Sequence, residues 1–86
     1  METEEEVKNI QSKIIAIPST NYMSIKLDNE EIKMYIQEDT IITEGNKDIS
    51  FSDLGVGDKV DISYVKTGGF LIFEVIYIAK AIKVLQ

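Results

Sequence analysis

The sequence predicts an all-β fold, a small closed barrel of five to six strands in Greek-key order. The chain has only 86 residues, 44% of them hydrophobic, and these are mainly isoleucine and valine, which favour a pleated sheet. Short runs of alternating polar and apolar residues follow one another too closely to leave room for a crossover helix. Such strands leave exposed edges, and small all-β domains remove those edges by closing into a barrel.

The N-terminal segment allows two interpretations. We expect residues 1–7, METEEEV, to form a disordered acidic tail and residues 8–86 to form one domain. Over residues 3–14, however, Val7, Ile10 and Ile14 have helical spacing, and Thr3 precedes Glu6 by the three residues of a capping box. A short helix is therefore one alternative, and a first strand that begins near Lys8 is the other, which we favour.

The next two runs predict a β-hairpin. Residues 22–27 (YMSIKL) and 31–37 (EIKMYIQ) both alternate with period two, and the polar residues 28–30 join them. The first run places Met23 and Ile25 on one face and Tyr22 on the other. Residues 40–43 form a short extended piece that follows the hairpin.

The second half of the chain predicts two further strands. Residues 59–65 (KVDISYV) alternate, with Val60, Ile62 and Tyr64 facing inward, and the glycine pair of residues 66–69 forms a turn. A last strand runs from Phe70 to about Val84. We expect the first and last strands to be the long, curved ones and a short helical turn to lie near residues 51–55. This arrangement is typical of an OB-like barrel.

The composition argues against several classes of function. The chain contains no histidine, cysteine, tryptophan or arginine, and all nine basic residues are lysines. It therefore lacks the side chain that titrates near neutral pH and the usual ligands of zinc and copper. With a net charge of −6, the chain repels a phosphate backbone overall. We expect no enzyme activity, no cofactor, no metal and no nucleic-acid partner, and no run approaches the roughly 20 apolar residues of a membrane span.

The segment FSDLGVGDKV (residues 51–60) resembles a phosphate-binding loop, but a turn explains it better. A P-loop needs GxxxxGK[ST], and a dinucleotide loop needs a third glycine and a following helix; neither pattern is present. We expect Ser50 or Ser52 to cap a short helical turn, Gly55 or Gly57 to end it with a positive φ, and Leu54 and Val56 to face the core.

Acidic residues raise two further hypotheses. Calcium binding would need about six to eight convergent oxygen atoms; the candidates are Glu44, Asp48, Asp53, Asp58 and Asp61, and we expect them to be solvated instead.

Glu74 is the only charged residue within FLIFEVIYIA. If it were buried, its pKa would be raised and it could act chemically. We favour exposure, or a bulge that resets the alternation, because lone carboxylates are rarely buried.

The aromatic residues supply the candidate binding surface. Tyr22 and Tyr35 fall on the polar faces of the predicted hairpin, near two lysines. The candidate residues of this surface are Tyr22, Tyr35, Lys26, Lys33, Phe73 and Tyr77. Aromatic platforms of this kind stack the bases of single-stranded nucleic acid, which is the alternative function, although they normally lie in a basic groove. The outer face of the last strand, with Leu71, Phe73, Val75 and Tyr77, is alternatively a partner or homodimer patch.

Several segments together resemble a known group of bacterial proteins. They are KIIAI (residues 13–17), Asp39-Thr40 with Ile42, FSDLGVGDKV and the ending around Ala79 to Val84. The chain resembles bacterial secreted or lipoprotein domains of unknown function with an OB-like barrel, including the YobA-type family. Ser12 stands where such domains often have a glycine, and Val75-Ile76-Tyr77 follows Glu74 where YobA-type chains tend to carry a serine and a proline.

The resemblance implies an extracytoplasmic location in the cell envelope, if a signal sequence has been removed, and it implies no catalytic residues. We therefore expect a non-enzymatic binding or adaptor module whose partner is a protein or a small ligand of low negative charge.

Overall fold

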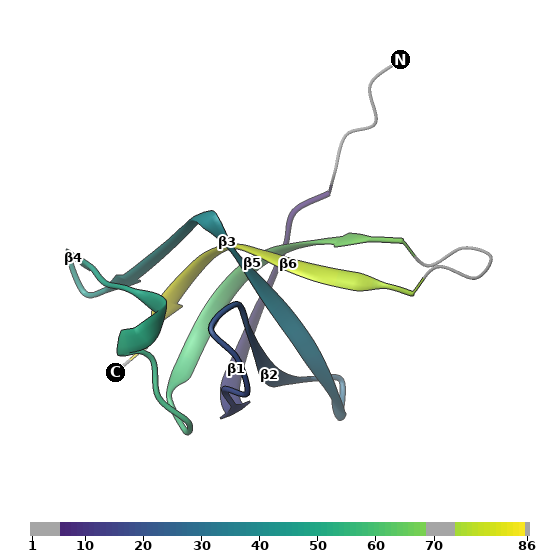
Figure 1. Cartoon of the computed structure of the whole chain (residues 1–86), viewed down its shortest axis with the longest axis horizontal. Coiled ribbons are helices and arrows are strands. Elements are labelled where there is room, and N and C mark those ends of the chain that lie inside the picture. Colours follow the sequence, from purple (N-terminus) through teal and green to yellow (C-terminus); the bar gives the residue numbers. More distant parts are fainter. Residues whose placement is uncertain (1–5, 69–73, 86) are drawn as a thin grey trace, which may run out of the picture.

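The computed structural model describes residues 6–68 and 74–85 and is nearly all β (Figure 1). Its elements, in chain order, are β1 (Lys8–Ala16), β2 (Tyr22–Leu27), β3 (Glu30–Glu44), β4 (Lys47–Asp48), the 3-10 turn η1 (Phe51–Asp53), β5 (Lys59–Thr67) and β6 (Ile76–Val84). No helix long and apolar enough to cross a membrane occurs in this part of the chain.

The β2–β3 hairpin forms where the alternating sequence predicts it. Asp28 and Asn29 join the strands with φ values of 52° and 68°. Two consecutive residues with positive φ are what a tight hairpin turn of right-handed twist requires, and Asp and Asn tolerate that conformation better than most residues. The turn fixes the register, so that Tyr22 lies opposite Tyr35 and Met23 lies opposite Met34.

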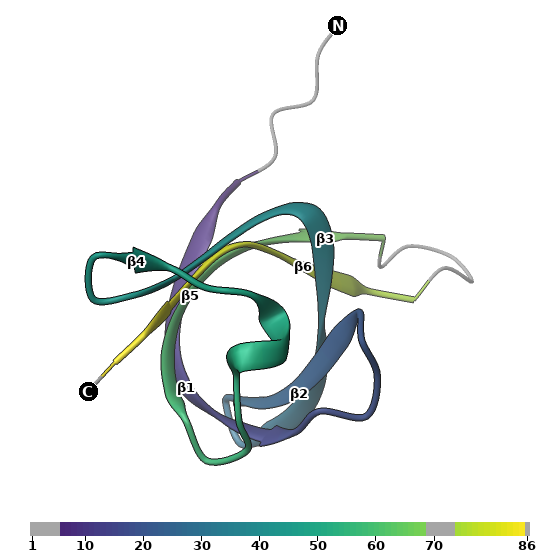
Figure 2. The same ribbon diagram turned by 60° about the vertical axis from the view of Figure 1, so that its left-hand side comes forward.

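Five of the strands close into a barrel. The sheet order is β2-β1-β5-β6-β3-β4, and the additional pairing of β2 with β3 completes the ring. All of these pairings are antiparallel except β3 with β6. In Figure 2 the strands surround a central space and η1 lies across it, while β4 lies outside the ring. The predicted fold class is confirmed.

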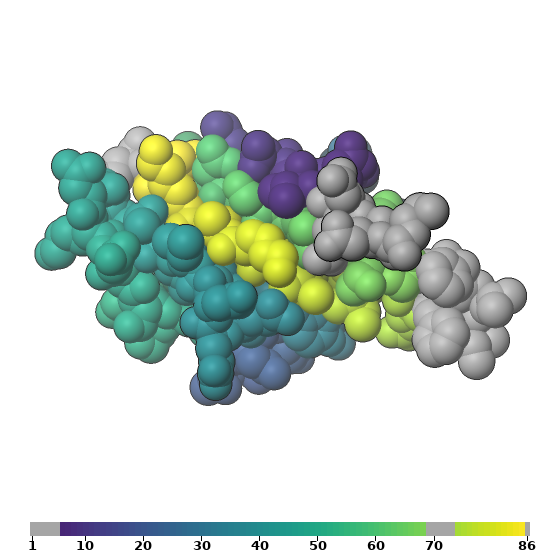
Figure 3. Space-filling view, turned by 90° about the horizontal axis from the view of Figure 1, so that it is seen from above, coloured from purple at the N-terminus to yellow at the C-terminus, as the bar shows by residue number. Residues whose placement is uncertain are grey.

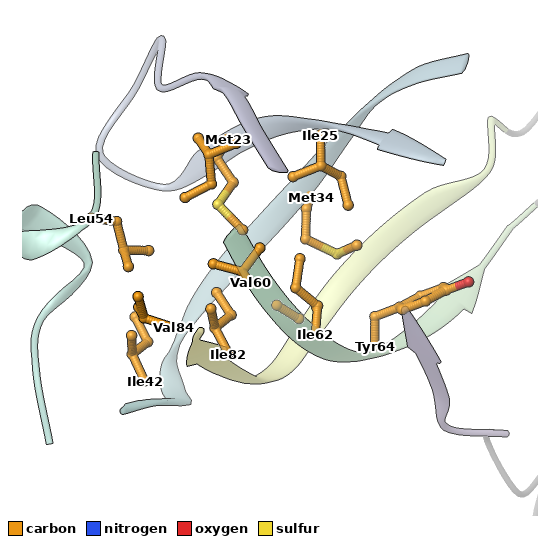
Figure 4. Packing of buried hydrophobic residues seen from close by; sticks show 12 residues of the cluster. Met23, Ile25, Met34, Ile42, Leu54, Val60, Ile62, Tyr64, Ile82 and Val84 are labelled. Atoms are coloured by element: carbon orange, nitrogen blue, oxygen red, sulfur yellow. The ribbon is translucent and has the colours of Figure 1, made fainter. Parts of the chain in front are cut away.

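The interior of the barrel is filled by apolar side chains from every strand of the ring (Figure 4). Met23 and Ile25 from β2, Met34 from β3 and Val60 and Ile62 from β5 have no exposed surface. Each such side chain contributes about 1.5–3 kcal/mol by leaving water. The inward positions predicted for Val60, Ile62 and Tyr64 are confirmed.

Irregularities in the strand pairing, among them one in β6 and one in β3, interrupt the regular alternation. In β6, Ala81 lies opposite Ser63 and Ala79 lies opposite Tyr64, so Lys80 is an extra residue that forms a β-bulge. In β3, the pairing with β6 is interrupted between Ile36 and Ile41.

The interruption in β3 is bridged by Thr40. Its hydroxyl accepts a hydrogen bond from the backbone N–H of Gln37 at 2.9 Å and donates one to the carbonyl of Ala79 at 2.8 Å. The residues predicted as a separate extended piece therefore continue β3, which at 15 residues is the longest strand.

The predictions for the first and the last strand of the chain have different outcomes. The strand alternative for the N-terminus is confirmed from Lys8 on, and the helix alternative is wrong there; residues 1–5 lie outside the described part. The last strand begins only at Ile76, so the expectation of one strand from Phe70 is wrong at Glu74 and Val75. Residues 69–73 also lie outside the described part.

The segment that precedes β5 forms a short 3-10 turn, as predicted, but two details of the prediction are wrong. No glycine ends η1, because its C-terminal cap is Leu54, whose φ is −81°. The Asp53 carboxylate accepts a hydrogen bond from the Ser50 backbone N–H at 2.9 Å, Gly57 has a φ of 97°, and Leu54 is buried. Val56, however, is 65% exposed, so its predicted place in the core is wrong. The turn places Leu54 in the core with Phe51 packed against it, and the chain then leaves the core until Val60.

Candidate functional site

Two tyrosines and a lysine meet on the outside of the β2–β3 hairpin. Met23 and Met34 point into the core, so their neighbours Tyr22 and Tyr35 point outward. The two ring centroids are 5.5 Å apart with 42° between the planes, within the range of favourable aromatic pairs. The Nζ atom of Lys33 lies 5.3 Å from the centroid of the Tyr22 ring, a cation–π distance. The structure thus brings together three of the six predicted residues.

The bulge at Lys80 adds two residues that the sequence did not indicate. Because Ala79 faces the core, Ile78 faces outward, and it pairs with Tyr35 on one side and Val65 on the other. Val65 is 1% exposed but does not belong to the core cluster, as expected for a residue buried on the outside of the sheet. If β6 had no bulge, Ile78 would lie on the same face as Ile82 and would point into the barrel.

Together these residues form what we call the outer stripe, an apolar row that crosses four strands. Its members, in order across the strands, are Val65, Ile78, Tyr35 and Tyr22. Val65 is buried, whereas Ile78 and the two tyrosines are half-buried and so keep part of their surface in contact with solvent. Figure 3 views the outside of the barrel and shows β6 (yellow) at the surface beside β3 (teal).

Of the remaining predicted residues, Tyr77 borders Lys33 and Tyr35 only across a shared groove, and Lys26 lies apart from the tyrosine pair. The side chain of Tyr77 points to the same side of β6 as that of Ala79 and packs against the core. Its ring centroid lies 5.8 Å from that of Tyr64. Its predicted place on the outer face is therefore wrong. Lys26 is exposed further along the hairpin and pairs with Glu31, so its charge has an opposite charge across the strand. Phe73 lies outside the described residues.

A shallow groove adjoins the outer stripe where β3 and β6 begin. It has a volume of about 250 Å³ and is lined by Ile32, Lys33, Tyr35, Glu74, Val75, Ile76 and Tyr77. Glu74 is exposed at this groove, as favoured from the sequence, so the hypothesis of a buried carboxylate is wrong. Val75 and Ile76 are 41% and 43% exposed, and the groove therefore combines apolar surface with one charge of each sign.

Two of the five acidic residues considered for calcium stabilise turns instead. Asp58 accepts a hydrogen bond from the Gly55 backbone N–H at 2.9 Å, just as Asp53 accepts one from Ser50. Among residues 6–68 and 74–85, no three acidic side chains lie close enough together to hold a metal ion.

Comparison with known proteins gave no match to a family model, to a curated protein or to a solved structure. The resemblance to YobA-type domains therefore stays a prediction.

Proposed function

We propose that the barrel is of the OB type and that its outer stripe binds a ligand. The ring order β1-β2-β3-β6-β5, with β3 and β6 parallel, supports the first part. In OB-type barrels the face of the second and third strands, with the loops beside it, binds oligonucleotides or oligosaccharides. Tyr22, Lys33 and Tyr35 occupy that face here.

The function that these residues support best is non-enzymatic binding of a ligand of low negative charge, in an adaptor or binding module of the bacterial cell envelope. The Tyr22–Tyr35 pair with Lys33 carries this proposal. Tyrosine offers a flat apolar ring and a hydroxyl at low conformational cost, which suits a ligand with flat apolar faces and polar edges. A neutral oligosaccharide has this character, and it avoids the repulsion that a chain of net charge −6 exerts on polyanions.

Two further observations support a binding role. Every charged side chain in the described part of the chain is exposed or half-buried, and no carboxylate is held in an apolar pocket there. An envelope location rests on the YobA-type resemblance, and Lys33 places one positive charge beside the Tyr22 ring of the stripe in an acidic molecule.

Calorimetric titration with an uncharged N-acetylglucosamine oligomer tests the proposal. We expect millimolar or tighter binding that is weakened about ten-fold by Tyr22→Leu, because losing one stacked ring costs on the order of 1–2 kcal/mol. Lys13→Gln, a change of an exposed lysine on β1 outside the outer stripe, is the control and leaves the affinity unchanged. Absence of binding to any uncharged glycan would contradict the oligosaccharide assignment.

Single-stranded nucleic acid is the second candidate ligand. The same tyrosine pair is close enough to stack successive bases, and Lys26 and Lys33 would meet the backbone. Fluorescence anisotropy with a labelled oligothymidylate at low salt decides between the two. Binding in the range of about 10–100 μM, the weak end of non-specific affinity, would favour this candidate, whereas no change in anisotropy would remove it.

A homodimer through the last strand is a separate proposal about the partner. The exposed Val75 and Ile76 at the start of β6 support it. Analytical ultracentrifugation of the wild type and of Ile76→Lys tests it, because an added charge at that surface would dissociate such a dimer and leave a monomer unchanged.

A further inference from the structure

A hollow in the surface lies between two segments that are far apart in the sequence. It has a volume of about 590 Å³, within the range of small-molecule sites. One wall is the connection from β1 to β2, with Ile17, Pro18 and Thr20, and the other is the η1 turn, with Phe51, Ser52 and Leu54. It shares no residue with the outer stripe.

The floor of the hollow belongs to the barrel core. Leu54 is 6% exposed and part of the core cluster, and Ile17 and Phe51 pack against that cluster. These side chains therefore present apolar surface that is fixed by packing in the barrel, and a ligand can be placed against it without reordering them.

Local hydrogen bonds hold both walls. In η1, the backbone N–H of Leu54 donates to the carbonyl of Phe51 at 3.1 Å. In the opposite wall, the Asn21 carbonyl accepts a hydrogen bond from the Ile36 N–H at 2.8 Å, and the Asn21 side chain accepts one from the Ser19 hydroxyl at 2.8 Å. The shape of the hollow is therefore defined before any ligand enters.

The chemistry of the lining selects the ligand. Four hydroxyl side chains and four apolar ones line the hollow, and none of these described residues is charged. The nearest carboxylates in the sequence, Asp53 and Asp58, are engaged by the backbone N–H groups of Ser50 and Gly55. A charged group placed here would lose water without gaining a partner of opposite charge, which is unfavourable.

We propose that this hollow is a binding site for a small, uncharged, largely apolar molecule that contains a ring. The ring lies against Phe51 and Leu54, and a polar group of the molecule bonds to the hydroxyls of Thr20 and Ser52 at the rim. The site is distinct from the outer stripe and independent of the function proposed for it.

A pair of fluorescent probes tests the site. Phenylnaphthylamine is uncharged, and anilinonaphthalene sulfonate has the same skeleton with an added sulfonate. We expect saturable enhancement of phenylnaphthylamine fluorescence and about ten-fold or weaker affinity for the sulfonate, because its charge finds no partner in the hollow. Equal affinity for the two probes would overturn the assignment to uncharged ligands.

Variants locate the probe. Thr20 and Ser52 are exposed, so Thr20→Arg and Ser52→Arg leave the fold intact while the apolar stems of the new side chains obstruct the mouth of the hollow and the guanidinium groups stay in water. We expect each to reduce phenylnaphthylamine affinity at least about ten-fold, whereas Thr67→Arg, at an exposed position on β5, serves as the matched control and does not. Unchanged affinity in both hollow variants would overturn the proposal. The variant Tyr22→Leu keeps probe binding even if glycan binding is lost, which separates this site from the outer stripe.

Discussion

Replacing Thr40 by valine tests how the irregularity in β3 is stabilised. The change keeps the shape of the side chain and removes two hydrogen bonds, one within β3 from the Gln37 N–H at 2.9 Å and one from β3 to the Ala79 carbonyl of β6 at 2.8 Å. A hydrogen bond of this kind contributes about 0.5–1.5 kcal/mol, so two of them predict a loss of about 1–3 kcal/mol in the free energy of unfolding. The carbonyl that loses its partner belongs to Ala79, which is fully buried.

Urea unfolding followed by far-ultraviolet circular dichroism measures this loss. A domain of this size loses about 4–8 °C in Tm for each kcal/mol, so a thermal scan gives a second readout. Thr43→Val is the matched control, because Thr43 is a half-buried residue of the same strand whose hydroxyl makes no side-chain hydrogen bond within the described part. We expect it to change stability by less than about 0.5 kcal/mol. Equal effects of the two substitutions would refute the role assigned to the Thr40 hydroxyl.

Two other changes in stability follow from the structure. Gly57→Ala destabilises by about 1–3 kcal/mol because φ is 97° there, although open space surrounds the added methyl group; Gly55→Ala, without a positive φ, is close to neutral in the same thermal scan. Ile62→Ala creates a cavity in the core and costs about 2–5 kcal/mol in urea unfolding, whereas Val56→Ala, at an exposed position, stays within about 0.5 kcal/mol. A large effect at Val56 would show that it is buried after all.

The hairpin was predictable because its signals are local. Residues 22–37 alternate with period two, and Asp28-Asn29 supplies a turn whose geometry those residues tolerate, so no distant contact is needed to define the register. The turn before β5 is local in the same way, since the carboxylates of Asp53 and Asp58 bond to backbone groups three residues away.

The composition of the outer stripe was not predictable, because it depends on partners far away in the chain. Ile78 and Tyr77 exchange their expected faces only because Lys80 is an extra residue between two pairings with β5. Nothing in the sequence IYIAKAIKV marks Lys80 as the extra residue. A shift of one residue in a strand moves every side chain that precedes it to the opposite face of the sheet. Similarly, β3 continues past Gln37 because the Thr40 hydroxyl donates a hydrogen bond to the carbonyl of Ala79, which lies 39 residues later in the chain.

Tyr22, Tyr35 and Ile78 share one outer surface, and we propose that this surface binds an uncharged glycan. Nuclear magnetic resonance titration of the labelled protein with an N-acetylglucosamine oligomer tests both parts in one measurement. We predict saturable shifts in the signals of Tyr22, Lys33, Tyr35 and the methyl groups of Ile78, with the core methyl groups of Ile62 unaffected. Shifts that omit Ile78, or a spectrum without any change at saturating glycan, would contradict the proposal.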